Sequence, residues 1–94
     1  MSQKKRLEWS IKSQNNVADI QDYLIGKNPA AADRVLTEIR ATARGLCDFP
    51  LLGNQGRRAG TRELVLIKYP YIVIYRVTVT KVIVAAVLHQ RQKH

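Results

Sequence analysis

The side chains of this sequence that could do chemistry are mainly cations in its C-terminal part. Arginine binds phosphate or carboxylate through a planar fork of donors, and histidine exchanges a proton near neutral pH. Several of these side chains lie in or beside short strand-like runs, so a single sheet could gather them into an anion-binding site. The candidate binding residues are Arg57, Arg58, Arg62, Arg76, His89 and Arg91.

Three of these candidates could cleave RNA without a metal ion if they met at one point. Arg62 and Arg76 would bind the phosphate, and His89 would act as the base toward a ribose 2′-hydroxyl. Neighbouring arginines would lower the proton affinity of His89 and keep it neutral. A different interpretation of Arg76 is an ion pair within the chain, for instance with Glu63. Three tyrosines could stack a base, although strand tyrosines more often pack in a core: Tyr69, Tyr71 and Tyr75.

Other kinds of site lack the residues that they need. Cys47 is the only cysteine, which excludes a disulfide within the chain and a cysteine-based metal site and fits a reducing compartment. His89 and His94 are the only histidines, too few for a zinc site without distant carboxylates. We find no phosphate-binding glycine motif and no serine triad pattern. We therefore expect no metal and no cofactor.

The charge of the chain is strongly positive and unevenly distributed. Sixteen Lys and Arg against seven Asp and Glu give a formal net charge of +9, and Glu63 is the only acidic residue after position 56. Such a protein usually binds something acidic. The run Lys4–Arg6 is predicted to be a solvated tail. Because no segment looks like a membrane span or a secretion signal, we expect a cytoplasmic protein without membrane association.

The first half of the chain predicts a strand and two helices. Residues 7–11 alternate apolar and polar side chains, as a short strand does. A first helix would end near Gly26, and its candidate caps are Ser13, Asn15 and Asn16. Asn28 can cap a second helix that begins at Pro29. The apolar residues of that helix share one face: Ala32, Val35, Leu36, Ile39, Ala43 and Leu46.

The second half predicts a loop followed by three strands. Residues 50–61 are rich in glycine and read as a loop, and residues 62–68, 71–78 and 81–89 are rich in Val, Ile, Tyr and Thr. Alternation along the middle strand places Arg76 on the face opposite Tyr75. The order β-α-α-β-β-β predicts a single α+β domain over residues 1–94, with a helix hairpin packed on a small antiparallel sheet.

Several of these segments together resemble the ParE/RelE superfamily of bacterial toxins from type II toxin–antitoxin systems. The stretches that carry the resemblance are VADIQDYL, NPAAADRVLTEI, GTRELVLIKYPYIVIYRV and VIVAAVLHQRQ, which span nearly the whole chain. The resemblance implies a helix hairpin on a small sheet. It also implies a hetero-oligomer with an acidic antitoxin whose C-terminal segment covers the basic surface of the toxin.

The target divides this superfamily. RelE-like members are endonucleases that cleave mRNA on the ribosome, and ParE-like members act on DNA gyrase. RelE-like proteins carry more cations in the turn before the third strand, and this chain has Pro70 where they usually have an acidic or amide residue. They also have a lysine-rich loop, which Arg57 and Arg58 replace at best. The ending VLHQRQ resembles that of ParE-like toxins. The resemblance thus favours a gyrase inhibitor that is not an enzyme.

Two alternatives remain open at this stage. One is a RelE-like, metal-independent endoribonuclease in which Arg62, Arg76 and His89 are catalytic and the partners are ribosome and mRNA. The other is a basic nucleic-acid-binding module without toxicity, for which the sequence offers no known DNA- or RNA-binding motif.

Overall fold

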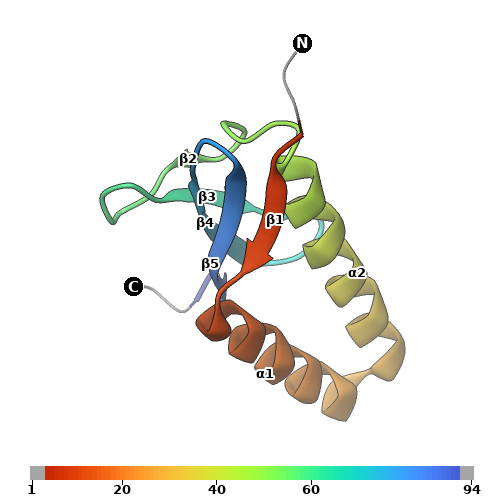
Figure 1. Cartoon of the computed structure of the whole chain (residues 1–94). Helices are drawn as coiled ribbons and strands as arrows, with labels where there is room; N and C mark the ends of the chain where they lie inside the picture. Colours follow the sequence, from red (N-terminus) through yellow and green to blue (C-terminus); the bar gives the residue numbers. More distant parts are fainter. Residues whose placement is uncertain (1–3, 92–94) are drawn as a thin grey trace.

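A sheet of five strands carries a helix hairpin on one face in the computed structural model, which describes residues 4–91 (Figure 1). The predicted α+β class and the order of the predicted elements are confirmed. The loop predicted over residues 50–61 contains one further strand, which is only two residues long. The elements are β1 (Arg6–Trp9), α1 (Ile11–Lys27), α2 (Pro29–Leu46), β2 (Asn54–Gln55), β3 (Arg62–Val65), β4 (Tyr71–Val77) and β5 (Lys81–His89).

The sheet is mixed, so the prediction of a purely antiparallel sheet is wrong at one edge. The strand order is β1-β5-β4-β3-β2, and β1 runs parallel to β5 while the other pairs are antiparallel. Tight turns join the later strands and enforce antiparallel pairing among them. β1 and β5 are instead separated by both helices and the whole meander, so no local turn fixes their relative direction.

Helix α1 begins earlier than the sequence predicted. The Ser10 hydroxyl accepts a hydrogen bond from the Ser13 amide at 3.0 Å and donates one to the Ala85 carbonyl at 2.9 Å, so Ser10 is the N-cap. The predicted caps are therefore wrong: Ser13 is buried inside the helix, and the Asn16 side chain accepts a hydrogen bond from the Val87 amide at 3.0 Å. Polar side chains of α1 thus attach this helix to β5.

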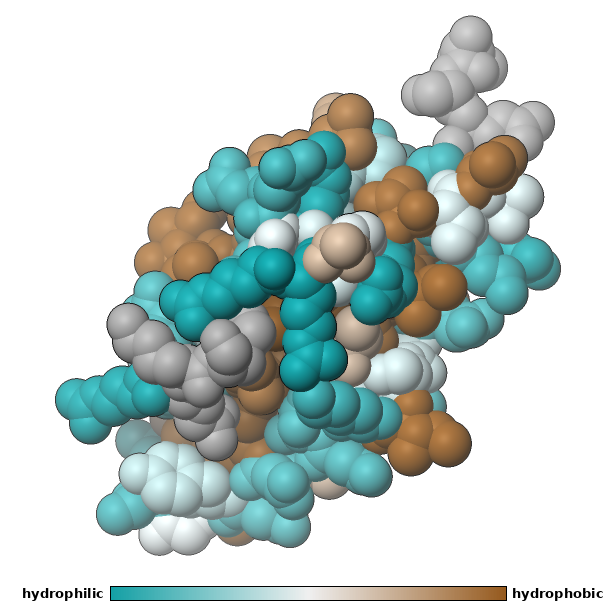
Figure 2. All heavy atoms as spheres, turned by 90° about the vertical axis from the view of Figure 1, so that its left-hand side faces the viewer, coloured by the Kyte–Doolittle hydropathy of each residue, from teal (hydrophilic) through white to brown (hydrophobic). Residues whose placement is uncertain are grey.

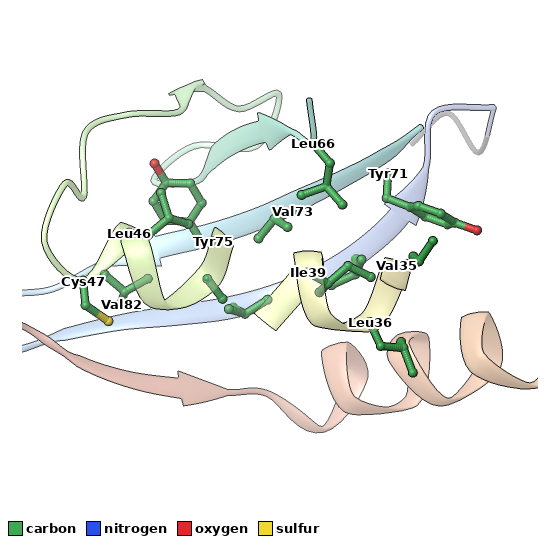
Figure 3. Close-up of a cluster of buried hydrophobic side chains, with 13 residues drawn as sticks. Val35, Leu36, Ile39, Leu46, Cys47, Leu66, Tyr71, Val73, Tyr75 and Val82 are labelled. Carbon is green, nitrogen blue, oxygen red and sulfur yellow. The ribbon is translucent and has the colours of Figure 1, made fainter. Parts of the chain in front are cut away.

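Helix α2 follows its prediction closely. The Asn28 side chain accepts hydrogen bonds from the amides of Ala30 and Ala31, and Pro29 occupies the first helical position. All six residues of the predicted apolar face are buried. The core forms where this face meets the sheet, with Ile39 and Leu46 against Val73, Tyr75 and Val82 (Figure 3).

The buried hydroxyl of Tyr75 connects β4 to the chain that follows α2. It donates a hydrogen bond to the Pro50 carbonyl at 2.8 Å and accepts one from the Gly53 amide at 2.9 Å. A side chain at Gly53 would place its Cβ 2.8 Å from the Tyr75 oxygen and from the Glu63 carbonyl, so this close approach requires glycine. Tyr71 and Tyr75 are both buried, which confirms core packing rather than base stacking for these two residues.

The N-terminal segment is attached to the sheet, and the prediction of a solvated tail is wrong. The Lys5 ammonium donates hydrogen bonds to the carbonyls of Thr78 and Val79, at 2.9 and 2.8 Å. The Lys5 amide donates to the Cys47 carbonyl, and Lys4 lies 3.9 Å from the Asp48 carboxylate. Within residues 4–91, no helix is long and apolar enough to cross a membrane.

The Tyr75 contacts predict a stability effect. We expect Tyr75→Phe to lower the free energy of unfolding by about 1–3 kcal/mol, because the Pro50 carbonyl and the Gly53 amide lose a buried partner. Urea unfolding followed by circular dichroism would measure the change. The matched control is Tyr23→Phe. Tyr23 is 63% exposed, so this substitution should change the free energy of unfolding by less than about 0.5 kcal/mol. Equal stability of the two variants would contradict this prediction.

Burial also predicts a dependence of stability on alkaline pH. Desolvation raises the pKa of Tyr75, and it raises the pKa of Tyr71 in the same way. In the unfolded chain tyrosine ionises near pH 10. Above that pH the unfolded state releases protons that the folded state retains, so the free energy of unfolding should fall. Urea midpoints measured between about pH 8 and pH 11 should decrease, and less steeply in Tyr75→Phe. Parallel curves for both proteins would argue against a role of Tyr75.

Candidate functional site

The sheet face that carries no helix is the candidate functional surface. Alternation along β4 turns Arg76 toward this face and Tyr75 toward the helices, as predicted, since Arg76 is exposed and Tyr75 is fully buried. Figure 2 views the molecule from the left-hand side of Figure 1, where hydrophilic side chains gather at the centre and hydrophobic ones lie between and around them. We call this surface the open face.

A hollow of about 160 Å³ on the open face collects cations from three distant segments. Lys12 comes from the first turn of α1, Arg58 from the loop before β3, and Arg76 from β4. Glu63 is the one carboxylate among its lining residues, so the cations outnumber it three to one. An anion bound here would contact guanidinium and ammonium groups above an apolar floor, made of Ile74, Ala85, Ala86 and Leu88.

The loop before β3 positions two of these cations. The Thr61 hydroxyl and amide both donate to the Arg58 carbonyl, at 2.7 and 3.1 Å, which closes the turn that carries Arg58. The Arg76 guanidinium donates to the Ala59 carbonyl at 3.3 Å. Gly60 has a φ of +79°, and a Cβ there would lie 3.0 Å from the Arg76 guanidinium. Glycine therefore provides both the turn and the space for Arg76.

Arg57 lies in the same loop but makes a different contact. Its amide donates to the Glu63 carboxylate at 3.2 Å, and its side chain is exposed. This hydrogen bond holds one oxygen of the carboxylate that lines the hollow. Arg57 therefore contributes to the site through the position of Glu63.

Arg62 lies on the opposite side of the sheet from Arg76. It pairs directly with Tyr75, and directly paired strand residues share a face, so Arg62 lies on the helix side. Its guanidinium donates to the Gly53 carbonyl at 2.6 Å. Arg62 thus stabilises the chain segment that Tyr75 also holds.

His89 and Arg91 lie at the far end of the sheet. His89 pairs with Tyr71, and the two rings meet edge to face with centroids 5.3 Å apart. The His89 Nδ1 accepts a hydrogen bond from the Arg91 amide at 3.1 Å. Both residues line a groove of about 720 Å³ between the helix hairpin and the ends of β4 and β5, together with Ile20, Tyr23, Leu24 and Tyr69.

A β-bulge in β5 decides which face of the sheet His89 lies on. Ile74 pairs with Ala86 and Tyr75 pairs with Val84, so Ala85 is an extra residue in β5. An extra residue reverses the face of every side chain beyond it. Strict alternation from Ile83 would place His89 on the open face, whereas the bulge turns it toward the helices. Its separation from Arg76 along the sheet has another cause, because His89 pairs with Tyr71 and Arg76 pairs with Ile83.

The structure therefore brings Arg58 and Arg76 together and leaves Arg62 and His89 elsewhere. The strand partners of Arg62 and His89 are Tyr75 and Tyr71, which lie about 14 Å apart along β4. Sequence reasoning missed Lys12, because the predicted caps placed it before the helix. The signal was Ser10, which is also a good N-cap residue and would have put Lys12 in the first turn.

The remaining titratable candidates do not add a reactive group to this surface. Cys47 is buried, and desolvation raises the pKa of its thiol, which disfavours the nucleophilic thiolate. Within the described part of the chain, no group of three or more His, Cys, Asp or Glu side chains could hold a metal ion. His94 lies outside the described residues.

Comparison with known sequences and structures gives consistent matches. Residues 7–94 match the family described as "ParE toxin of type II toxin-antitoxin system, parDE". The chain is 34% identical over 90 residues to "Putative toxin Y4kP" of Sinorhizobium fredii, covering 96% of this chain and 93% of that protein.

Two solved structures share the fold. A chain of the chromosomal ParDE system from P. aeruginosa superposes with a TM-score of 0.83 at 20% identity, over 94% of this chain and 98% of the other. A chain of the RelBE2 toxin–antitoxin complex from Mycobacterium tuberculosis superposes with a TM-score of 0.67 at 20% identity, over 93% and 99%. The match over residues 7–94 covers almost every element described above, and the chain belongs to the ParE toxin family of type II toxin–antitoxin systems.

Proposed function

We propose that this toxin inhibits DNA gyrase through protein–protein contact and does not cleave RNA. The observation that supports this most is the separation of the three groups that cleavage would need. Arg76 lies on the open face, Arg62 on the helix side, and His89 at the far end of the sheet. General base catalysis requires its groups within hydrogen-bond reach of one substrate bond.

The surroundings of the open face support the same proposal. A surface that binds single-stranded RNA usually offers aromatic rings on which bases stack. The strand tyrosines Tyr71 and Tyr75 are buried on the other side of the sheet. Among the described residues that line the open-face hollow, the side chains between the cations are mainly aliphatic and none is aromatic. Such a lining suits the surface of an acidic protein better than it suits a nucleotide base.

The partner that neutralises the toxin is proposed to be an acidic antitoxin encoded beside it. The relatives in P. aeruginosa and M. tuberculosis belong to a ParDE system and to a toxin–antitoxin complex, respectively. A carboxylate-rich antitoxin segment on the open face would pair with Arg58 and Arg76 and cover the apolar floor of the hollow. The predicted cytoplasmic location belongs to this proposal, since gyrase and its DNA lie there.

The open-face cations predict the electrostatics of antitoxin binding. We expect Arg58→Gln combined with Arg76→Gln to weaken binding of the antitoxin by about tenfold, because two charge pairs are lost. The loss should shrink at high salt, where these pairs are screened. Isothermal titration calorimetry at two salt concentrations would measure both effects. Arg34→Gln combined with Arg44→Gln, both exposed on α2, is the matched control, and an equal loss in that variant would refute a specific open-face contact.

The gyrase proposal predicts a direct effect on the purified enzyme. Addition of the toxin should abolish supercoiling of plasmid DNA or cause cleaved DNA to accumulate, and prior addition of the antitoxin should prevent this. Gel electrophoresis of the plasmid would show either result.

The same protein should leave mRNA intact on translating ribosomes. Unaffected gyrase at large molar excess would exclude the proposed function, and cut mRNA would establish the endonuclease alternative. Tight, salt-dependent binding to DNA alone, without either activity, would indicate the non-toxic binding module.

A further inference from the structure

Three large hydrophobic side chains are exposed in the segment between α2 and β2. Phe49, Leu51 and Leu52 are 68%, 67% and 62% exposed. Single exposed apolar side chains are normal on soluble proteins, and Ile67 is an example in another loop. Three such residues within four positions form a patch of the kind that marks interaction sites. We call residues 49–52 the apolar loop.

The backbone of the apolar loop is held in one conformation. The Phe49 amide donates to the Gly45 carbonyl at 3.0 Å, and the Leu52 amide donates to the Phe49 carbonyl at 3.1 Å. From the core side, the Tyr75 hydroxyl donates to the Pro50 carbonyl and accepts from the Gly53 amide. A loop fixed in this way loses little conformational entropy on binding, so its apolar contacts would contribute more fully to affinity.

The apolar loop and the open-face hollow lie on different sides of the sheet. The loop is tied to Tyr75 and Arg62, which face the helices, whereas Arg58 and Arg76 line the hollow on the other side. A partner could therefore occupy one surface without covering the other. This separation allows one protein to bind two partners of different chemistry.

We propose that the apolar loop is the surface through which the toxin contacts its target protein, an inference that rests on the proposed inhibition of gyrase. The partner surface that fits is an apolar pocket bordered by carboxylates. Two lysines and one carboxylate lie beside the loop, since the Lys5 amide donates to the Cys47 carbonyl and Lys4 lies 3.9 Å from Asp48, and one positive charge remains in excess. A second copy of this chain is a poor occupant, because each copy carries a net charge of +9.

The test compares a loop variant with a control variant that removes a still more exposed apolar side chain in another loop. The test protein carries Leu51→Ser and Leu52→Ser together, and the control carries Ile67→Ser, whose side chain is 97% exposed. Thermal unfolding would verify that both fold, as expected for exposed positions. The readouts are the toxin concentration that halves gyrase supercoiling and the affinity for the antitoxin.

We expect half inhibition to require at least about tenfold more of the loop variant than of the wild type. Loss of a central apolar contact at an interface typically has an effect of this size. Its antitoxin affinity and the behaviour of Ile67→Ser should match the wild type. Unchanged inhibition by the loop variant would overturn this inference while the proposed function stands. A parallel loss of antitoxin affinity would also overturn it, because the loop would then belong to the antitoxin surface. Wild-type toxin without effect on gyrase would contradict both proposals.

Discussion

The hydroxyl group of Tyr75 joins the sheet to the loop before β2 and fixes the position of the exposed residues in that loop. The ring fills the core between α2 and the sheet, while the oxygen satisfies the Pro50 carbonyl and the Gly53 amide. Arg62 completes the arrangement by binding the Gly53 carbonyl from β3. Because the ring is fully buried, these polar contacts are shielded from water and cannot be replaced by it. The loop therefore takes its shape from the core beneath it.

The bulge at Ala85 decides the face on which the last residues of β5 lie. It is attached to the start of α1, because the Ser10 hydroxyl that caps the helix also donates to the Ala85 carbonyl. The same bulge turns His89 away from the open face. Ser10 therefore caps α1 and also holds the bulge residue of β5.

Local signals in the sequence were sufficient for much of the fold. Helix α2 could be predicted because Asn28, Pro29 and the spacing of its apolar residues all act within one helix. The strands from Arg62 onward could be predicted because β-branched residues and tight turns follow one another. The parallel partner of β1 could not, since it depends on contacts with residues some 75 positions away. The composition of the site was only partly predictable. Alternation gave the face of Arg76, and the local cap residue Ser10 could have given the place of Lys12. The bulge that decides the face of His89 depends on pairing between strands and has no local signal.

The pairing of β1 with β5 has a consequence for synthesis of the protein. Arg6 pairs with Lys81 and Trp9 with Val84, so β1 can pair only after residues 81–84 have been synthesised. Until then, β1 has no strand to pair with, whereas α2 can already pack against β3 and β4. Pairing between such distant segments makes folding slow and late. We thus expect β1 to join the sheet last, after the antiparallel strands have paired with one another.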